Sequence, residues 1–237
     1  MTEKSYIKMV SENLAEIEKN ITDAASSVGK KREDVILLAA TKTVSPEIIN
    51  HAINSGVKYI GENRVQEFLS KENEIQTNVC RHFIGHLQTN KAKDIVGRVA
   101  MIESVHSLKL ANLIGKLSCD LGIETDILLE VNIGKEENKS GFIKEELDEI
   151  IPQIAKIEGV NLRGLMTIPP ICEKKTEIIP YFEEMYKLFI DNRDKKIDNV
   201  SMDYLSMGMS SDYAEAIKCG SNLVRVGTSL FGKRNYK

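Results

Sequence analysis

The chain has 237 residues, of which 42% are hydrophobic and 28% are charged, with a formal net charge of −3. This composition is typical of a globular protein with a substantial core, and the small net charge gives no reason to expect nucleic acid or an anionic membrane surface as a partner. No apolar stretch has the length of a signal peptide or of a membrane span, so we expect a cytoplasmic protein that does not contact a membrane.

The first long segment of the chain has the pattern of an amphipathic helix. Its apolar residues recur mostly at spacings of three and four between Ile7 and Val28, with charged residues between them. Beyond it, short apolar runs alternate with amphipathic segments of helical length. The predicted strands are 35–41, 57–62, 82–85, 99–105, 126–133, 162–168, 204–209 and 223–227. The predicted helices are 46–55, 63–75, 88–97, 107–121, 143–156, 176–191 and 210–219.

This alternation predicts an α/β fold with parallel strands, because each helix must cross over between two strands. Eight such units in a chain of about 250 residues are typical of a closed (β/α)₈ TIM barrel, here with an extra N-terminal helix. An open, doubly wound sheet is the competing architecture. Because the sequence shows no linker, low-complexity tract or internal repeat, we expect residues 1–237 to form a single domain.

The strand at 35–41 ends at Lys42, just before the helix start signal Ser45-Pro46-Glu47. Partial burial of a lysine at the mouth of a strand disfavours its charged form, and the neutral amine is a nucleophile toward aldehydes. A Schiff base with pyridoxal phosphate, the commonest protein-bound aldehyde, is therefore one interpretation of Lys42. The other is an ordinary solvated strand end.

Polar or small residues also follow the other predicted strands. In a barrel, the C-terminal ends of all strands share one face, so these residues predict a polar pocket. For His86 and His106 we favour a capping or loop-bracing role, and no pair of histidines has the spacing of a metal site. The four cysteines are scattered and predict neither a zinc site nor a disulfide framework. The other residues at strand ends are Asn63, Asn132 and Thr167.

The loops after the last two strands are rich in serine and glycine. Small residues there allow backbone N–H groups to approach a phosphate, although the same residues are common in turns and helix caps. Arg225 lies between Val224 and Val226, so its side chain should point the opposite way from theirs. Either a buried ion pair with a carboxylate or a hydrogen bond to the pyridine nitrogen of a cofactor would account for it.

Several sequence blocks, in order along the chain, resemble the pyridoxal phosphate homeostasis protein family, the single-domain relatives of the alanine racemase barrel. Two positions depart from the forms usual in that family: Arg81 stands where a tryptophan is common, and Arg64 where a tyrosine is frequent. Both leave open how the pocket entrance is built. The blocks are AATKT (39–43), GENRVQE (61–67), HFIGHLQTNK (82–91), SVHS (104–107), GLMTIP (164–169) and LSMGMSSDYAEAIKCGSNLVRVGTSLFG (205–232).

The resemblance implies specific roles in the site. Lys42 would hold pyridoxal phosphate as a Schiff base, Arg225 would face the pyridine nitrogen, and Asn63 would lie near the ring. The residues implied at the phosphate are Ser206, Ser210, Gly227 and Thr228.

The resemblance also implies that the protein buffers and delivers pyridoxal phosphate and carries no committed catalytic residue. In the two-domain racemases, the acid/base tyrosine on the opposite face is associated with a β-rich second domain, for which we expect no room in this chain. The alternative is an amino acid racemase that recruits Tyr59, Tyr204 or Tyr213. A third possibility is a cofactor-free interaction module. We expect apo enzymes as recipients of the cofactor, and a monomer, because no predicted helix has a wide apolar stripe.

Overall fold

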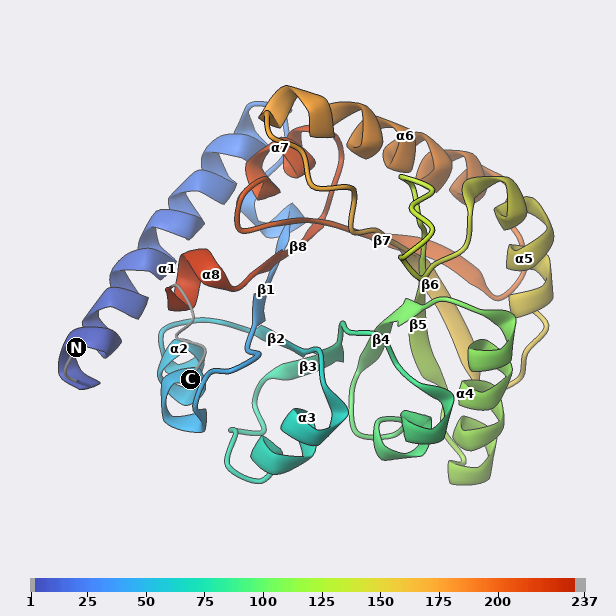
Figure 1. The fold of residues 1–237 in the computed structure, drawn as a ribbon, viewed down its shortest axis with the longest axis horizontal. Coiled ribbons are helices and arrows are strands. Elements are labelled where there is room, and N and C mark those ends of the chain that lie inside the picture. Colours follow the sequence, from blue (N-terminus) through green and yellow to red (C-terminus); the bar gives the residue numbers. More distant parts are fainter. Residues whose placement is uncertain (1–2, 233–237) are drawn as a thin grey trace.

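Eight parallel strands close into a barrel in the order β1 to β8, and β8 is hydrogen-bonded back to β1. The computed structural model describes residues 3–232, and Figure 1 shows the ring of strands with helices around it. At the closing seam, Leu38 pairs with Arg225 and Ala39 with Val226. The strands are β1 (Ile36–Ala40), β2 (Tyr59–Glu62), β3 (Cys80–Phe83), β4 (Met101–Val105), β5 (Thr125–Glu130), β6 (Val160–Met166), β7 (Val200–Met209) and β8 (Leu223–Val226).

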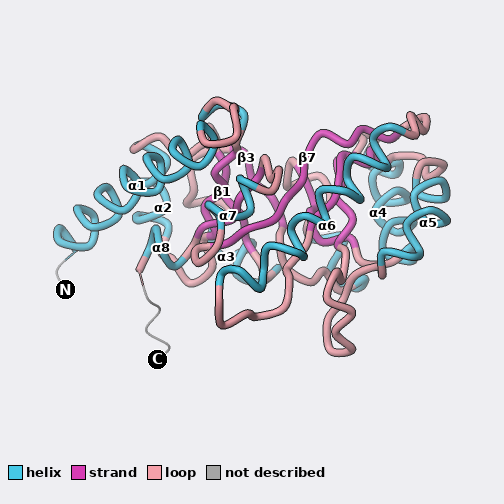
Figure 2. The backbone as a smooth tube through the Cα atoms, turned by 90° about the horizontal axis from the view of Figure 1, so that it is seen from above, coloured by secondary structure: helices cyan, strands magenta, loops and turns pink. Residues whose placement is uncertain are grey.

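Helices cover the outside of the barrel. The N-terminal helix α1 (Glu3–Ser26) is extra to the barrel and contacts α2, α7 and α8, as Figures 1 and 2 show. The others are α2 (Pro46–Asn54), α3 (Val65–Lys71), α4 (Leu108–Leu121), α5 (Leu147–Ile154), α6 (Lys175–Asp194), α7 (Tyr213–Lys218) and α8 (Thr228–Phe231), with 3₁₀ helices η1 (Arg32–Asp34), η2 (Thr89–Asp94) and η3 (Lys144–Glu146).

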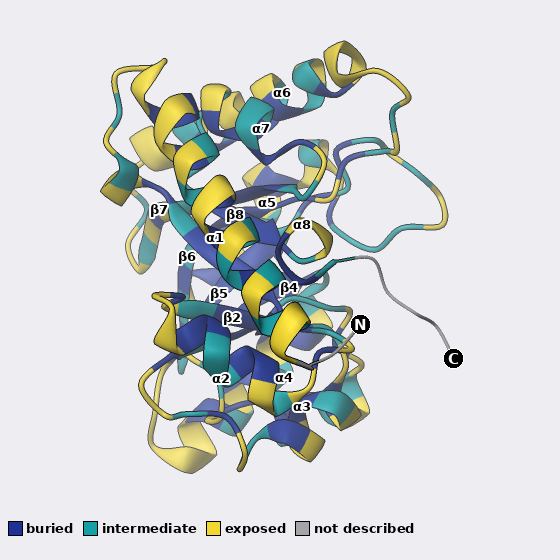
Figure 3. Cartoon of the chain, turned by 90° about the vertical axis from the view of Figure 1, so that its left-hand side faces the viewer, coloured by how far each residue is buried: buried dark blue, intermediate teal, exposed yellow. Residues whose placement is uncertain are grey.

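Alternation along the strands divides the buried residues between the outside and the lumen of the barrel. On β4, Ile102 packs among residues of the outer helices, whereas Met101 belongs to a small separate cluster with Leu128, Met166 and Tyr204. Met101 and Glu103 therefore face the lumen. Figure 3 shows the strands buried and the outer surfaces of the helices exposed. The apolar layers thus lie between the strands and the helices, and one end of the lumen is left for polar side chains.

The predicted (β/α)₈ barrel with an N-terminal helix is confirmed. The helical segment predicted over 88–97 is shorter than expected, because it forms the 3₁₀ helix η2, which ends at Asp94, and only Ala92 is buried within it. Val28 was counted on the buried face of the first helix, but it follows the end of α1 and is 40% exposed. The single domain over 1–237 stays a prediction. Within residues 3–232, no helix is long and apolar enough to cross a membrane.

Candidate functional site

The turn that carries Lys42 directly follows β1 at the C-terminal end of the barrel. Leu37 and Ala39 pack outward against the layer under α1 and α2, so alternation directs Lys42 toward the lumen side, and its side chain is half-buried. The next residue, Thr43, has a φ of 64°. This left-handed conformation costs a β-branched residue about 1 kcal/mol or more, and surrounding contacts must hold it.

A chain of hydrogen bonds crosses the inside of the barrel from β8 to β3. Arg225 Nη1 donates to Ser206 Oγ (2.5 Å), and Nη2 donates to the carbonyl of Thr167 (2.9 Å). Ser206 Oγ donates to Glu103 Oε2 (2.6 Å), whose Oε1 accepts from His82 Nδ1 (2.6 Å). All five residues are buried. The guanidinium of Arg225 is therefore held in one orientation from two sides.

The charged groups along this chain of hydrogen bonds stabilise one another's ionised forms. Burial opposes the protonated form of His82, but hydrogen bonds to Cys80 and Glu103 outweigh it and raise the pKa of His82 to about 9. Burial likewise opposes ionisation of Glu103, yet His82, Arg225 and Ser206 together hold the pKa of its carboxyl below the usual range. Burial lowers the pKa of Arg225, which the carboxyl groups of Glu103 and Glu130 partly offset. At neutral pH, the lumen therefore holds a protonated histidine beside an ionised glutamate.

Two buried polar atoms that border the lumen at this end of the barrel, Asn63 Oδ1 and Glu130 Oε2, have no hydrogen-bond partner within the described residues, and a third, Glu62 Oε2, lies on the outer side of β2. Burial raises the pKa of Glu130 to about 7, although the nearby charge of Arg225 lowers it. Buried polar atoms are rarely left without partners in a folded protein. The atoms of Asn63 and Glu130 follow or end strands beside the lumen, so a bound polar ligand there could satisfy them.

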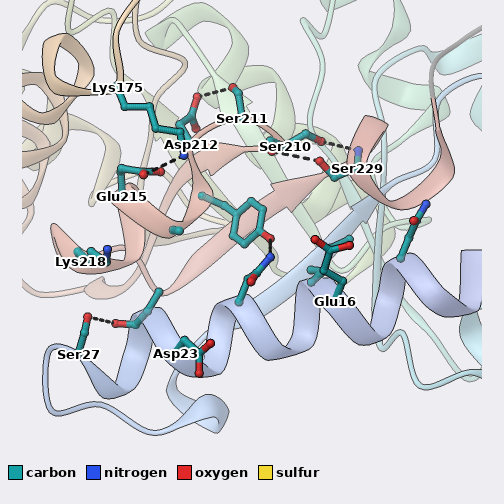
Figure 4. A pocket seen from close by; sticks show the side chains of 16 residues that line it. Glu16, Asp23, Ser27, Lys175, Ser210, Ser211, Asp212, Glu215, Lys218 and Ser229 are labelled. Carbon is teal, nitrogen blue, oxygen red and sulfur yellow. Dashed lines mark hydrogen bonds and ion pairs between the residues drawn. The ribbon is translucent and has the colours of Figure 1, made fainter.

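Backbone N–H groups converge on Ser210 where β8 turns into α8. Gly227 N and Ser229 N each donate to Ser210 Oγ at 3.1 Å, and Ser229 Oγ donates to the carbonyl of Ser210 at 3.1 Å. A Cβ on Gly227 would lie 3.2 Å from the carbonyl oxygen of Ala40, so this loop lies against the end of β1. Figure 4 shows Ser210 and Ser229 at the edge of a groove of about 660 Å³ that α1 and α7 line. The two N–H groups converge on one point, which Ser210 Oγ occupies, and converging backbone N–H groups are donors of the kind that bind anions.

Comparison with known proteins identifies the family. The alanine racemase N-terminal domain family matches residues 13–235. A pyridoxal phosphate homeostasis protein of Aquifex aeolicus is 42% identical over 228 residues, which cover 95% of this chain and 98% of the relative. The corresponding protein of Escherichia coli K12 is 34% identical over 231 residues, which cover 96% and 97%. The chain belongs to the pyridoxal phosphate homeostasis protein family.

Solved structures agree with this family assignment. A protein of unknown function from Bifidobacterium adolescentis superposes with a TM-score of 0.92 at 32% identity, covering 97% of each chain. PipY of Synechococcus elongatus, solved with pyridoxal phosphate bound, superposes with a TM-score of 0.82 at 30% identity, covering 94% of this chain and all of PipY. The match to an alanine racemase of Clostridium difficile has a TM-score of 0.74 at 20% identity and covers 97% of this chain but only 58% of the racemase. The two proteins share the fold.

Within this homeostasis protein fold, most of the predicted site residues lie at the β1 and β8 ends. Ser210 and Gly227 meet directly, and Thr228 is the exposed first residue of α8 beside them. Ser206 is different: its completely buried hydroxyl lies in the lumen, between Glu103 and Arg225. The structure therefore places Ser206 apart from Ser210 and Gly227, since both hydrogen bonds of its hydroxyl are made inside the barrel, and its role at a phosphate stays a prediction.

The contacts of Arg225 decide only in part between a buried ion pair and a hydrogen bond to the pyridine nitrogen of a cofactor. Val224 and Val226 face the outer cluster and Arg225 faces the lumen, as the alternation predicted. Its hydrogen bonds go to a hydroxyl and a carbonyl, and the carboxyl of Glu103 reaches it through Ser206. The sequence analysis missed Glu103, although a charged residue in the apolar run 99–105 was a signal for it.

The two histidines after β3 and β4 stack on each other, with ring centroids 4.3 Å apart. His86 Nδ1 lies 3.2 Å from Ser140 Oγ, and His106 Nδ1 lies 3.2 Å from the carbonyl oxygen of Ser104. Burial lowers the pKa of His106, and the neighbouring His86 lowers it further. The pair links the loops that follow β3, β4 and β5, which agrees with a loop-bracing role.

Proposed function

We propose that this protein binds pyridoxal phosphate as a Schiff base on Lys42 and acts in pyridoxal phosphate homeostasis as a carrier without committed catalysis. One observation carries the proposal. The turn of Lys42, the buried guanidinium of Arg225 and the N–H groups of Gly227 and Ser229 lie together where β8 closes against β1. An amine, a fixed donor and an anion site match the aldehyde, the pyridine nitrogen and the phosphate of that cofactor.

The residues of the site fit the cofactor in their chemistry. When bound, pyridoxal phosphate supplies an electrophilic aldehyde and an electron-accepting ring. The amine of Lys42 would bind the aldehyde, while Ser210, Gly227 and Thr228 would bind the phosphate through hydroxyl and N–H groups. Arg225 has five N–H donors, so donors remain for the pyridine nitrogen after its bonds to Ser206 and Thr167. Asn63, with its unpartnered oxygen, would lie near the ring.

The positions of three tyrosines support a carrier over a racemase. Racemisation needs a second acid/base group opposite the lysine. Tyr213 accepts a hydrogen bond from Asn20 of α1 on the outside of the barrel. The Tyr204 ring lies under Arg163, 5.6 Å from the guanidinium carbon to the ring centroid. Tyr59, at the start of β2, packs its ring edge-on to His82. Tyr59 and Tyr204 lie within strands, and Tyr213, although it begins α7 after the end of β7, directs its hydroxyl to α1 and away from the lumen.

An amino acid racemase of the same cofactor class is the alternative function. Its support is the fold shared with the alanine racemase of Clostridium difficile. Recipients of the cofactor would be apo enzymes that use pyridoxal phosphate, and we propose that the carrier acts as a monomer in the cytoplasm.

The test is the visible absorption spectrum of the purified protein before and after borohydride reduction, followed by peptide mass mapping. A band that disappears on reduction, with phosphopyridoxyl mass on Lys42, is the expected result. A protein that stays colourless and unmodified after incubation with pyridoxal phosphate would overturn the proposal. Stereoinversion of an amino acid at about one turnover per second or faster would replace the carrier with the racemase.

A further inference from the structure

Both peptide groups that flank Lys42 are held by side chains of α3. The carbonyl of Thr41, on the N-terminal side, accepts from Lys71 Nζ at 3.0 Å. The N–H of Thr43, on the C-terminal side, donates to Glu67 Oε1. The orientations of these two peptide planes fix the φ and ψ angles of the residue between them. Lys71 and Glu67 therefore hold the backbone from which the Lys42 side chain leaves.

The two α3 side chains belong to a buried ion cluster. Lys71 Nζ lies 3.1 Å from Glu62 Oε1 and 2.5 Å from Glu67 Oε1, and the three side chains are 11%, 3% and 18% exposed, respectively. With the carbonyl of Thr41, the three N–H donors of the ammonium have three acceptors. Thr41 Oγ1 also donates to Glu62 Oε1 at 2.7 Å, which joins the turn to the cluster a second time.

The cluster explains how the strained conformation of Thr43 persists. Its φ of 64° is unfavourable for threonine, and the contact from Glu67 acts on the N–H of that same residue. Without that contact, the turn could relax to a negative φ, and the direction of the neighbouring Lys42 side chain would change. A nucleophile gains its rate advantage only when it is held close to its attack geometry.

We propose that Lys71 and Glu67 are positioning residues, which orient Lys42 for reaction with the aldehyde. This inference rests on the proposed attachment of pyridoxal phosphate to Lys42. Glu62 anchors Lys71 from β2, on the side of the strands away from the lumen, so neither α3 side chain needs to touch the cofactor. The competing explanation is that the ion cluster only attaches α3 to the barrel.

Two substitutions of Glu67 separate these explanations. Glu67→Gln keeps an oxygen that can accept from the Thr43 N–H, whereas Glu67→Leu removes it at similar volume. The measurement is the rate constant for borohydride-fixed labelling of Lys42 by pyridoxal phosphate, beside the melting temperature. We expect Glu67→Leu to lower the rate by about tenfold or more, and Glu67→Gln to recover most of it. Competition by inorganic phosphate should change in neither variant.

Arg163→Met is the matched control, because Arg163 also joins two carboxyl groups, those of Asp126 and Asp203, each at 2.7 Å. It should lower the melting temperature and leave the labelling rate unchanged. Labelling of Glu67→Leu at the wild-type rate would overturn the inference, as would equal slowing in all three variants. If Glu67→Leu fails to fold, Lys71→Met is measured against the same control, with the same expected loss. Wild-type protein without label on Lys42 would instead refute the proposed function itself.

Discussion

At the scale of single residues, the proposed site combines a lysine that is only half-buried with an arginine that is buried. Arg225 has hydrogen-bond partners on two strands, whereas Lys42 lies on a turn at the barrel rim. We therefore expect substitution of the lysine to remove chemistry with little effect on folding, and substitution of the arginine to affect both.

Lys42→Ala should abolish the borohydride-fixed adduct and shift the melting temperature of the cofactor-free protein by no more than a few degrees, since the residue lies outside the packed layers. Mass mapping and thermal unfolding measure the two quantities. Lys58→Ala, an exposed lysine just before β2 at the opposite end of the barrel, is the control and should label normally. Wild-type labelling of the Lys42→Ala protein would refute the assignment.

Ser206→Ala tests whether the lumen chain orients Arg225. Loss of the hydroxyl leaves Nη1 without its acceptor and Glu103 Oε2 without its donor. We expect weaker retention of pyridoxal phosphate, by about tenfold, because a hydrogen bond to a charged group contributes roughly 1.5 kcal/mol or more. Titration by absorbance gives the dissociation constant. Ser221→Ala, a second completely buried serine that bonds only backbone carbonyls, is the control.

At the scale of elements, α1 supports the loops that carry the residues proposed to bind the phosphate. Its apolar side packs against α7 and α8, which follow β7 and β8. These two helices are short, Tyr213–Lys218 and Thr228–Phe231, so tertiary contacts must supply most of their stability. The N-terminal helix is therefore part of the support of the site, although it lies outside the eight strand–helix units.

Ile21→Ala should expose this dependence. Ile21 is completely buried, so the cavity should cost about 2–5 kcal/mol of unfolding free energy, which corresponds to a fall of roughly 5–15 °C in melting temperature. Thermal unfolding measures the loss, and a titration with inorganic phosphate should show weaker binding as α7, which follows Ser210, loosens. Val28→Ala, at a residue 40% exposed beyond the helix, should change neither.

Most strands and helices could be predicted because the spacing of apolar residues along each segment is a local property of the sequence. The alternation of Val224, Arg225 and Val226, for example, is local information and placed the arginine in the lumen. The partners of that arginine could not be predicted in the same way. Ser206 of β7 and Thr167, just after β6, bond it directly, and Glu103 of β4 reaches it through Ser206. Nothing near them in the chain specifies which side chains meet across the barrel. The α3 contacts to the Lys42 turn were missed for the same reason.

At the scale of the whole molecule, the charged lumen makes stability depend on pH. The pKa of His82 is raised from 6.5 to about 9 in the folded protein. Between about pH 6.5 and pH 9, His82 is therefore protonated in the folded state and largely unprotonated in the unfolded state. The stabilisation is complete below about pH 6.5 and is lost as the pH rises through about 9.

We expect the melting temperature to fall by on the order of 5–10 °C between pH 6.5 and pH 9. His82→Asn should be less stable at pH 6.5 and should flatten this dependence. Differential scanning calorimetry across the range measures both. Ser221→Ala, at a completely buried serine whose hydroxyl bonds only backbone carbonyls, should keep the wild-type slope. A wild-type slope in His82→Asn would mean that other groups cause the pH dependence.

The seam between β1 and β8 joins the first strand of the chain to the last. Lys42 leaves the ribosome early, but Arg225 and Gly227, which we propose to complete the site around it, are made near the end of the chain. During synthesis, the groups proposed to surround the Lys42 amine are therefore absent until the barrel closes. A product truncated before β8 would lack the groups proposed to bind the pyridine nitrogen and the phosphate. Cofactor retention would thus report on completed translation, and a chain abandoned part-way would not withdraw pyridoxal phosphate from the cell.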